Sequence, residues 1–355
     1  MSAERSPIRV AILGATGAVG QTFIRLLAGH PWFQVAEVAA SDRSAGKRYA
    51  DATRWIEGEM PAEVAGLTVT ACDPGAVSSP IVFSALDSSV AGEVEGAFAA
   101  AGRLVLSNAK NYRMDPDVPL VIPEVNAEHL ALLDTQRARR GWTGGIVTNA
   151  NCAATMAAMA LAPLHAAFGA RRVFMATMQA VSGAGYPGVP SLDILGNVIP
   201  FIGDEEPKLE REMQKMLGHV ELGAVVNAPF VVSAHANRVA VENGHTVCLS
   251  VEFEHAPSVE AAGNVLRVWR GASVVRGLPS APPEPLHFFE NDDRPQPRRD
   301  AMRGRGMTVS VGRLRLDPLF HLKFVATGHN TIRGAAGGSI LNAELLVATG
   351  RAGVT

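Results

Sequence analysis

Cys152 is the residue of this chain whose type and setting best suit covalent chemistry. It follows an apolar, β-rich run at residues 145–148 and the polar stretch 149–151, and it opens an Ala/Met/Leu-rich segment to Phe168 that predicts a buried helix. A thiol at a helix N-terminus lies in a positive field that lowers its pKa and populates the thiolate. We therefore expect Cys152 to attack an acyl donor or aldehyde and to carry the acyl group as a thioester. Cys72 and Cys248 are expected to be buried structural thiols.

A thiol nucleophile of this kind needs a partner for its proton, and His245 is the candidate among the ten histidines. It follows a glycine turn at the expected start of a strand, and Arg238 lies a few residues before it. Spacing alone leaves open that His245 is an ordinary surface or core histidine.

A glycine turn near the N-terminus predicts a dinucleotide site. Gly14, Gly17 and Gly20 stand between a short apolar strand, residues 9–13, and a helical pattern at residues 19–28. Glycines at this junction let backbone amides approach a pyrophosphate at the positive end of the helix. The spacing is GxxGxxG rather than GxGxxG, and such a turn can also serve only to pack the helix on the strand.

The end of the second apolar run favours NADP over NAD. Ser41, Arg43 and Ser44 offer hydroxyl groups and a cation where an NAD enzyme often places an acid to hold the ribose, and these groups suit a 2′-phosphate. Asp42 keeps a plain solvated turn as the alternative. A thiolate beside a nicotinamide indicates hydride transfer to or from a thioester-forming carbonyl.

The order of the expected elements predicts two domains of the α/β class. Residues 1–150 alternate short strands and helices, which indicates a Rossmann-type domain with a mostly parallel sheet, here binding NADP. Residues 151–332 show longer strands and helices at 205–217 and 259–269, which indicates an α+β catalytic and oligomerisation domain with a mixed sheet. The C-terminal helical segment, 333–355, is expected to pack back on the first domain, and residues 182–189 and 279–306 are expected to be loops.

Composition and charge exclude several classes of protein. The net charge of -2 offers no basic face for nucleic acid. No apolar stretch approaches the roughly 20 residues that span a bilayer, and Met1–Arg9 lacks the apolar core of a signal peptide. The three cysteines match neither a disulfide framework nor a metal site. We expect a cytoplasmic enzyme with free thiols and no metal.

The sequence resembles the aspartate-semialdehyde dehydrogenase family, in particular its archaeal and fungal branch. The resemblance covers nearly the whole chain. It is carried by GATGAVG, Ser107-Asn108, residues 123–126, the NxNC motif at Cys152, Gln179 with SGAGYPGVPSLDIL, EEPKLERE, NDDRPQPRRD and HNTIRGAAGGSILNAEL.

The resemblance implies a role for each residue that matches the family's motifs. Cys152 would be the acyl-thioester nucleophile, His245 the general acid/base, and Gln179 the residue that positions the acyl group. Arg238 would bind the substrate α-carboxylate and Glu212 its amino group, while Arg113 and Lys215 would hold the phosphate. From the residues alone, Glu212 and Lys215 could equally be a solvated helix face. The NADP site would be lined by Gly14, Thr16, Gly17, Ala18, Val19, Ser41, Arg43, Ser44, Ser182, Gly183 and Asn330.

The chain departs from the usual family pattern at three positions, Ala150, Ala236 and Ala240, of which the last two flank Arg238. None removes a reacting group. The resemblance implies NADPH-dependent reduction of L-aspartyl 4-phosphate to L-aspartate 4-semialdehyde and phosphate, by a homodimer or homotetramer. Two alternatives stay open: a reductase of the same mechanism acting on a CoA thioester such as malonyl-CoA, and an NADP-binding module without catalysis.

Overall fold

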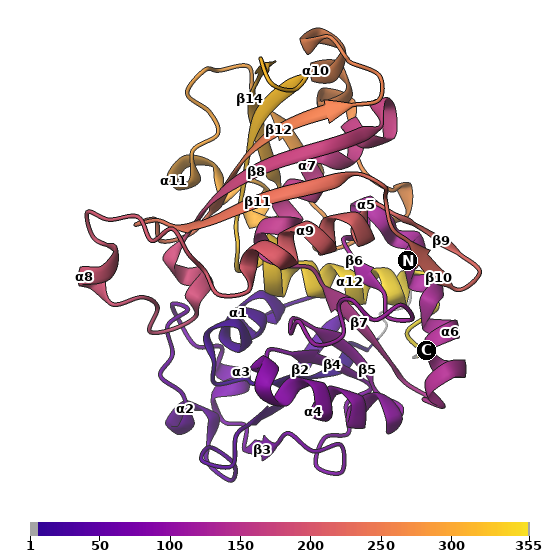
Figure 1. The fold of residues 1–355 in the computed structure, drawn as a ribbon. Coiled ribbons are helices and arrows are strands. Elements are labelled where there is room, and N and C mark those ends of the chain that lie inside the picture. Colours follow the sequence, from indigo (N-terminus) through magenta and orange to yellow (C-terminus); the bar gives the residue numbers. More distant parts are fainter. Residues whose placement is uncertain (1–5, 354–355) are drawn as a thin grey trace.

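The computed structural model describes residues 6–353, which form two large β-sheets (Figure 1). The first sheet has the order β3-β2-β1-β4-β5-β7-β6, and its paired strands are parallel. The second has the order β11-β8-β12-β15-β14-β13 and mixes parallel with antiparallel pairs. The expected fold, a Rossmann-type sheet plus a second domain with a mixed sheet, is therefore confirmed. Residues 1–5 of the expected leader-free N-terminus and residues 354–355 of the C-terminal segment lie outside the described residues.

The elements up to residue 149 build the first sheet and its helices. They are β1 Ile8–Leu13, α1 Ala18–Leu27, β2 Phe33–Ala40, α2 Tyr49–Ala52, α3 Ala62–Ala65, β3 Val69–Ala71, β4 Ile81–Ser84, α4 Ser88–Ala100, β5 Leu104–Ser107, β6 Leu120–Val121, α5 Pro123–Asn126, a 3-10 helix Ala127–Ala131, α6 Leu132–Arg140 and β7 Gly145–Asn149.

The elements after residue 151 build the second sheet and its covering helices. They are α7 Cys152–Phe168, β8 Ala170–Gln179, a 3-10 helix Val181–Ala184, α8 Ser191–Ile194, α9 Glu205–Met216, the hairpin β9 His219–Glu221 and β10 Ala224–Val226, β11 Val231–Arg238, β12 His245–Phe253, α10 Val259–Val268, a 3-10 helix Ser273–Val275, β13 Leu286–Phe288, α11 Pro297–Asp300, a 3-10 helix Arg303–Gly306, β14 Val309–Leu316, β15 Leu322–Gly328, a π-helix Ile332–Ala336 and α12 Gly337–Ala348.

Both faces of the first sheet are buried, as the apolar runs of its strands require. Alternate side chains of β1 point to opposite faces: Val10 and Ile12 pack with α1 and α12, whereas Ala11 and Leu13 pack with Phe98 of α4. Although α12 follows the second domain in the chain, it lies against β5 and β7 of the first sheet (Figure 1).

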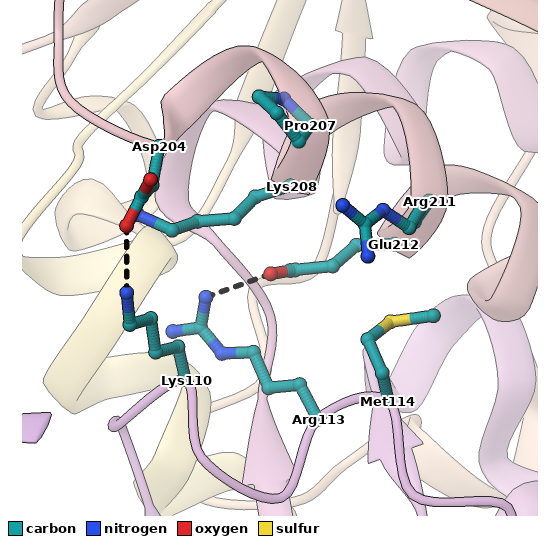
Figure 2. Close-up of a pocket in the computed structure, with 8 residues that line it drawn as sticks. All are labelled: Lys110, Arg113, Met114, Asp204, Pro207, Lys208, Arg211 and Glu212. Atoms are coloured by element: carbon teal, nitrogen blue, oxygen red, sulfur yellow. Dashed lines mark hydrogen bonds and ion pairs between the residues drawn. The ribbon is translucent and has the colours of Figure 1, made fainter.

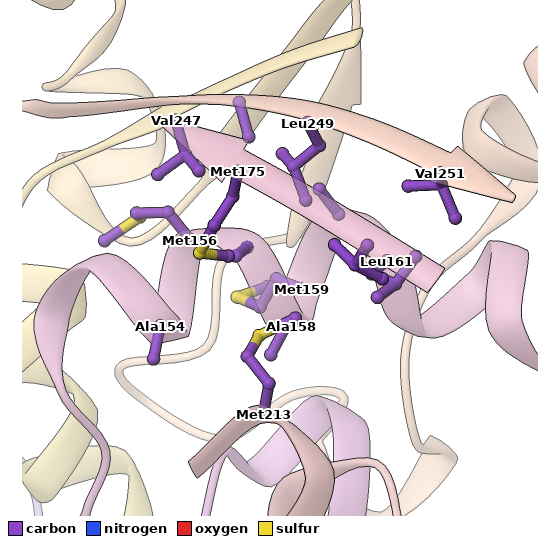
Figure 3. Packing of buried hydrophobic residues seen from close by; sticks show 14 of the residues in the cluster. Ala154, Met156, Ala158, Met159, Leu161, Met175, Met213, Val247, Leu249 and Val251 are labelled. Carbon is purple, nitrogen blue, oxygen red and sulfur yellow. The ribbon is translucent and has the colours of Figure 1, made fainter. Parts of the chain in front are cut away.

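One face of the second sheet is covered by α7. Met156 and Leu161 of this helix pack against Met175 of β8 and against Val247 and Val251 of β12 (Figure 3). Helix α7 also contacts α9, α10 and the π-helix Ile332–Ala336. Burial of an apolar side chain of this size stabilises the fold by about 1.5–3 kcal/mol, so this packing fixes where α7 begins.

Two stretches differ from the sequence-based prediction. Strand β11 was not expected, because two of its four buried side chains are small alanines and a third belongs to Arg238, and they alternate with polar Ser233, His235 and Asn237. Residues 279–306, expected as a loop, contain the short strand β13 and the single helical turn α11, because a few residues of pairing suffice to dock this segment beside β14. Within residues 6–353, no helix combines the length and the apolarity that crossing a membrane requires.

Candidate active site

Three of the expected site residues meet at one end of the second sheet. Strands β8 and β11 run parallel, and their last residues, Gln179 and Arg238, are register partners. Strand β12 runs antiparallel to β8, so its first residue, His245, lies beside the same end of β8. The sheet register therefore brings together side chains that are up to 66 positions apart in the sequence.

Helix α7 delivers Cys152 to this edge. Its N-cap is Asn151, whose side-chain oxygen accepts hydrogen bonds from the backbone N–H groups of Ala153 (2.9 Å) and Ala154 (3.0 Å). The Cys152 Sγ atom lies 3.1 Å from Nε2 of the fully buried His245. Gly334 of the π-helix is packed directly on the nucleophile, since a Cβ at this position would stand 2.6 Å from the Cys152 Cβ.

The protonation state of the thiol differs from the sequence-based expectation of a lowered pKa. Burial, together with the charge of Glu205, raises the pKa of the Cys152 thiol to about 12. The guanidinium of Arg113, the Ala153 N–H and the guanidinium of Arg238 act in the lowering direction, so the helix-terminus effect is present but smaller than desolvation. Burial therefore favours the neutral thiol of Cys152 over the thiolate.

The turn after β8 holds the Arg238 side chain close to His245. Its Nη1 donates to the backbone oxygen of Ala180 at 2.9 Å. A Cβ at Gly183 would lie 2.9 Å from this Nη1 and 2.9 Å from Cε1 of His245. Only glycine leaves both side chains where they are.

Glu205, at the start of α9, is a site residue that the sequence reasoning missed. One oxygen of its carboxylate accepts hydrogen bonds from Gln179 Nε2 (2.9 Å) and Asn151 Nδ2 (2.8 Å). Its other oxygen lies 3.5 Å from Nζ of Lys208. A buried carboxylate beside the nucleophile is therefore tied to the glutamine and to the cap of α7.

Glu212 and Lys215, two turns further along α9, occupy different surroundings. Glu212 is 2 % exposed, and its carboxylate pairs with Arg113 Nη1 at 2.9 Å and accepts the backbone N–H of Asn151 at 2.6 Å. Lys215 is equally buried, and its ammonium donates to the backbone oxygens of Arg113 (2.7 Å), Asp115 (2.7 Å) and Val118 (2.8 Å). These contacts use all three donors of the ammonium group. The structure thus brings Arg113 to the site, while Lys215 holds the loop that carries it.

A pocket opens between α9 and this loop (Figure 2). Lys110 pairs with Asp204 at 2.9 Å on one side of it, and Arg113 pairs with Glu212 on the other. The pocket is lined by Lys110, Arg113, Met114, Asp204, Pro207, Lys208, Arg211 and Glu212. Four cations face two carboxylates here, so the pocket carries a positive excess suited to a phosphate.

The glycine turn has the form of an anion-binding helix terminus. Gly14 has φ +71, and a Cβ there would stand 2.6 Å from the backbone oxygen of Ala85; a Cβ at Gly20 would stand 2.3 Å from the Gly14 oxygen. In the described chain, α1 has Gly17 as its N-cap, with no side-chain cap and no acid in the first turn. Its terminal N–H groups, near Thr16, Ala18 and Val19, are available to a pyrophosphate.

The other expected cofactor residues lie on two segments near this turn. Ser41 and Arg43 are exposed in the turn after β2, with Ser44 beside them. Asn330 donates from Nδ2 to Ser182 Oγ at 2.8 Å, and its Oδ1 accepts the Gly244 N–H at 2.9 Å. A cavity extends from the N-terminal half of α1, at Ala18 and Thr22, to Ser182 and His329. The residues present therefore fit a dinucleotide with a 2′-phosphate.

The comparisons with known proteins agree on one family. Residues 9–133 match the model of a semialdehyde dehydrogenase NAD-binding domain, and residues 161–333 match that of a semialdehyde dehydrogenase dimerisation domain. An aspartate-semialdehyde dehydrogenase of Archaeoglobus fulgidus is 50% identical over 95% of this chain and 97% of its own length. One from Schizosaccharomyces pombe is 47% identical over 96% and 98%. The chain belongs to the aspartate-semialdehyde dehydrogenase family.

A solved structure of an aspartate-semialdehyde dehydrogenase is also closely similar. The Candida albicans enzyme, determined with NADP, has a TM-score of 0.89 at 43% identity and covers 98% of this chain and 100% of its own. The Vibrio cholerae aspartate semialdehyde dehydrogenase II, complexed with ASA, has a TM-score of 0.76 at 28% identity over 97% and 99%. The resemblance read from the sequence motifs is thus confirmed.

Sequence reasoning missed Glu205, Lys208 and Asn151 for an identifiable reason. Helix α9 carries two Glu-x-x-Lys pairs, Glu205/Lys208 and Glu212/Lys215, seven residues apart and hence on one side of the helix. The pattern gives no preference between them. The only difference that the sequence offers is that Glu205 and Lys208 lie nearer the N-terminus of α9. In the structure this end of α9 lies beside Gln179, at the edge of the second sheet.

Proposed function

We propose that this chain catalyses the NADPH-dependent reductive dephosphorylation of L-aspartyl 4-phosphate to L-aspartate 4-semialdehyde and phosphate. The observation that carries the proposal is the Cys152 Sγ atom at 3.1 Å from His245 Nε2, between a buried carboxylate and two guanidinium groups. The names of relatives 44–50% identical over nearly the whole chain support the same activity.

The substrate is held by groups of both signs. Arg238 binds the α-carboxylate, for which its planar fork is suited, and Glu205 binds the amino group in place of the Glu212 that the family resemblance had implied. Glu212 forms an ion pair with Arg113, whereas Glu205 is hydrogen-bonded to Gln179 at the edge of the sheet where Arg238 lies. Arg113 and Lys208 in the cationic pocket bind the phosphate. An amino-acid-shaped ligand needs this pairing of cation and anion, whereas a CoA thioester does not.

Cys152 forms the covalent intermediate. Its sulfur bonds to the acyl carbon, the carbon–oxygen bond to phosphate breaks, and the thiol proton leaves with the phosphate. Gln179 donates toward the acyl oxygen, and His245 supplies Nε2 at the reacting centre. Bound NADPH, for which the glycine turn and the turn at Ser41–Ser44 are suited, supplies the hydride that reduces the thioester.

We further propose that the enzyme is a homodimer or homotetramer of the cytoplasm. Among residues 6–353, no helix covers the face of the second sheet on which Phe174, Val231 and His235 are exposed. The matched family model over residues 161–333 is described as a dimerisation domain, which supports assembly through the second domain. The three cysteines are free, which fits a reducing compartment. Mass measurement of the purified protein by light scattering tests the assembly.

The experiment that tests the activity follows NADPH formation when purified protein meets L-aspartate 4-semialdehyde, NADP and phosphate. Parallel reactions replace NADP by NAD, or supply malonate semialdehyde with CoA. Phosphate-dependent turnover that Cys152→Ser loses by a factor of 1,000 or more supports the proposal. Turnover only with CoA, or near-wild-type turnover in Cys152→Ser, contradicts it.

A further inference from the structure

Lys110 and Asp204 form an ion pair between the two domains at the rim of the cationic pocket (Figure 2). Lys110 lies in the loop after β5, and Asp204 is the residue immediately before α9. The Lys110 Nζ atom is 2.9 Å from Asp204 Oδ2, and the two side chains are 46 % and 73 % exposed. An ion pair as exposed as this one adds little to stability, because water and salt screen it. Removal of either side chain is therefore not expected to unfold the protein.

The ammonium group of Lys110 has donors to spare. Within residues 6–353, Asp204 is its only hydrogen-bond partner, and an ammonium group carries three N–H donors. Arg113, in the same pocket, already has each terminal nitrogen in a contact: Nη1 with Glu212 at 2.9 Å and Nη2 with the Asn108 oxygen at 2.8 Å. Lys110 is therefore the better placed of these two cations to take a new anionic partner.

The carboxylate of Asp204 is bound to a pocket cation and not to its own helix. Asp204 is the N-cap of α9, a position where an aspartate side chain usually accepts a hydrogen bond from the first turn. Here it makes no such bond, and its backbone has a left-handed φ of 58°, which is uncommon outside glycine. The hydrogen bond from Lys110 and the charges of Lys110 and Lys208 lower the pKa of this carboxyl, so it is ionised at neutral pH. A negative group thus already occupies the cation at the rim.

The pocket leads from this rim toward the nucleophile. Glu212 lines the pocket, and its carboxylate accepts the backbone N–H of Asn151 at 2.6 Å, one residue before Cys152. A phosphate group in this space would lie between the rim and the start of the catalytic helix. Phosphate is close to a dianion at neutral pH and offers several acceptor oxygens, so it competes well with a single carboxylate for an ammonium group.

We propose that Lys110 is a further phosphate-binding residue, and that Asp204 occupies its ammonium group until phosphate binds. Lys110 then exchanges the Asp204 carboxylate for a phosphate oxygen, and phosphate release re-forms the ion pair. Binding therefore opens the contact between the domains, and Asp204 lowers the affinity of the pocket for anions in general. This inference deepens the proposed function and rests on its phosphate-binding step.

Single substitutions of the two partners distinguish exchange from a simple interdomain contact. Lys110→Met removes the cation, whereas Asp204→Asn removes the competing charge at nearly the same size. We expect Lys110→Met to raise the KM for phosphate about tenfold or more and Asp204→Asn to lower it about twofold or more. The KM for L-aspartate 4-semialdehyde should stay unchanged in both. Lys47→Met, which removes an exposed lysine outside the pocket, is the control for loss of one positive charge. A pair that only joins the domains would shift both variants in the same direction, and this result would overturn the proposal.

Binding of inorganic phosphate, measured by isothermal titration calorimetry in the presence of NADP, tests the exchange without turnover. We expect phosphate to bind most tightly to Asp204→Asn, less tightly to wild type and most weakly to Lys110→Met. Any other order, or no binding to wild type, would overturn the proposal. Phosphate-dependent turnover with unchanged phosphate binding in Lys110→Met would reject the role of Lys110 and keep the proposed function. The expected order of binding without turnover of L-aspartate 4-semialdehyde would keep the exchange and reject the proposed reaction.

Discussion

The carboxylate of Glu212 joins Arg113 of the first domain to Asn151, the residue before the nucleophile. One oxygen pairs with Arg113 Nη1 at 2.9 Å and the other accepts the Asn151 N–H at 2.6 Å. Arg113, the proposed phosphate ligand, is therefore tied through one carboxylate to the start of the helix that carries Cys152. We expect this contact to couple binding of the leaving group to the position of Cys152.

Substitution of Glu212 by glutamine should destabilise the protein and lower its activity. The variant leaves the buried Arg113 guanidinium without its counter-charge, and breaking a buried pair costs about 3–5 kcal/mol. We expect a lower midpoint of urea unfolding and a fall of at least tenfold in kcat/KM. Glu210→Gln is the control, because Glu210 lies half-buried on the same helix with a longer contact, 3.3 Å, to the Ala234 N–H. Equal stability of the two variants would refute the coupling.

Lys215 and Lys208 should separate structure from phosphate binding. Lys215→Met leaves three backbone oxygens without their donor, which costs about 1–3 kcal/mol for each buried group left unsatisfied. We expect this variant to lose stability while its KM for phosphate stays within about threefold of wild type. Lys208→Met, on the rim of the cationic pocket, should keep its stability and raise the KM for phosphate at least tenfold. The reverse pattern would restore Lys215 as the phosphate ligand.

The sequence was informative about the fold and about residues that lie close together along the chain. The glycine turn and the helix behind Cys152 are continuous segments, so their patterns predict their local geometry directly. Contacts between neighbouring strands could not be predicted from these patterns, because they depend on the register of the strands. Arg238 ends a strand that the pattern did not reveal, and its pairing with Gln179 is set by 8 register partners.

The choice between the two acid–lysine pairs of α9 shows the limit most clearly. Glu205 and Glu212 share a helix face, and both are buried. Only the position of the first turn of α9 relative to Gln179 and Asn151 makes Glu205 the neighbour of the nucleophile. That position results from packing of α9 against β11 and α7, which no local pattern encodes.

Glu95 should make stability depend on pH. Burial raises the pKa of this carboxyl from 4.5 to about 7, although Ser107 Oγ donates to it at 2.8 Å. Since the folded-state pKa lies above the unfolded value, the stability contribution is full below pH 4.5 and is lost as pH rises to about 7. We expect wild type to lose about 2 kcal/mol relative to Glu95→Gln between pH 5.5 and 8, measured by urea unfolding. Parallel pH profiles of the two proteins would contradict the assignment.

Arg43 should determine the preference for NADP. It is exposed in the turn after β2, and a hydrogen bond to a charged group contributes about 1.5–3 kcal/mol. We expect Arg43→Ala to raise the KM for NADP at least tenfold and to leave the KM for NAD nearly unchanged. Lys47→Ala removes an exposed cation four residues further on and serves as the control. A similar effect of both variants would mean that only the general charge of this surface matters.

The packing of Gly334 on Cys152 has a consequence for biosynthesis of the enzyme. The wall behind the nucleophile comes from a segment made 182 residues later, as the end of the chain returns to the first sheet through α12. A nascent chain that has emerged from the ribosome only as far as β15 already contains the thiol, the imidazole and the glycine turn. It still lacks the surface that closes the reaction chamber. We therefore expect no turnover before the segment with Gly334 has been translated, and we expect a chain that ends at β15 to expose its thiol to solvent and to oxidants.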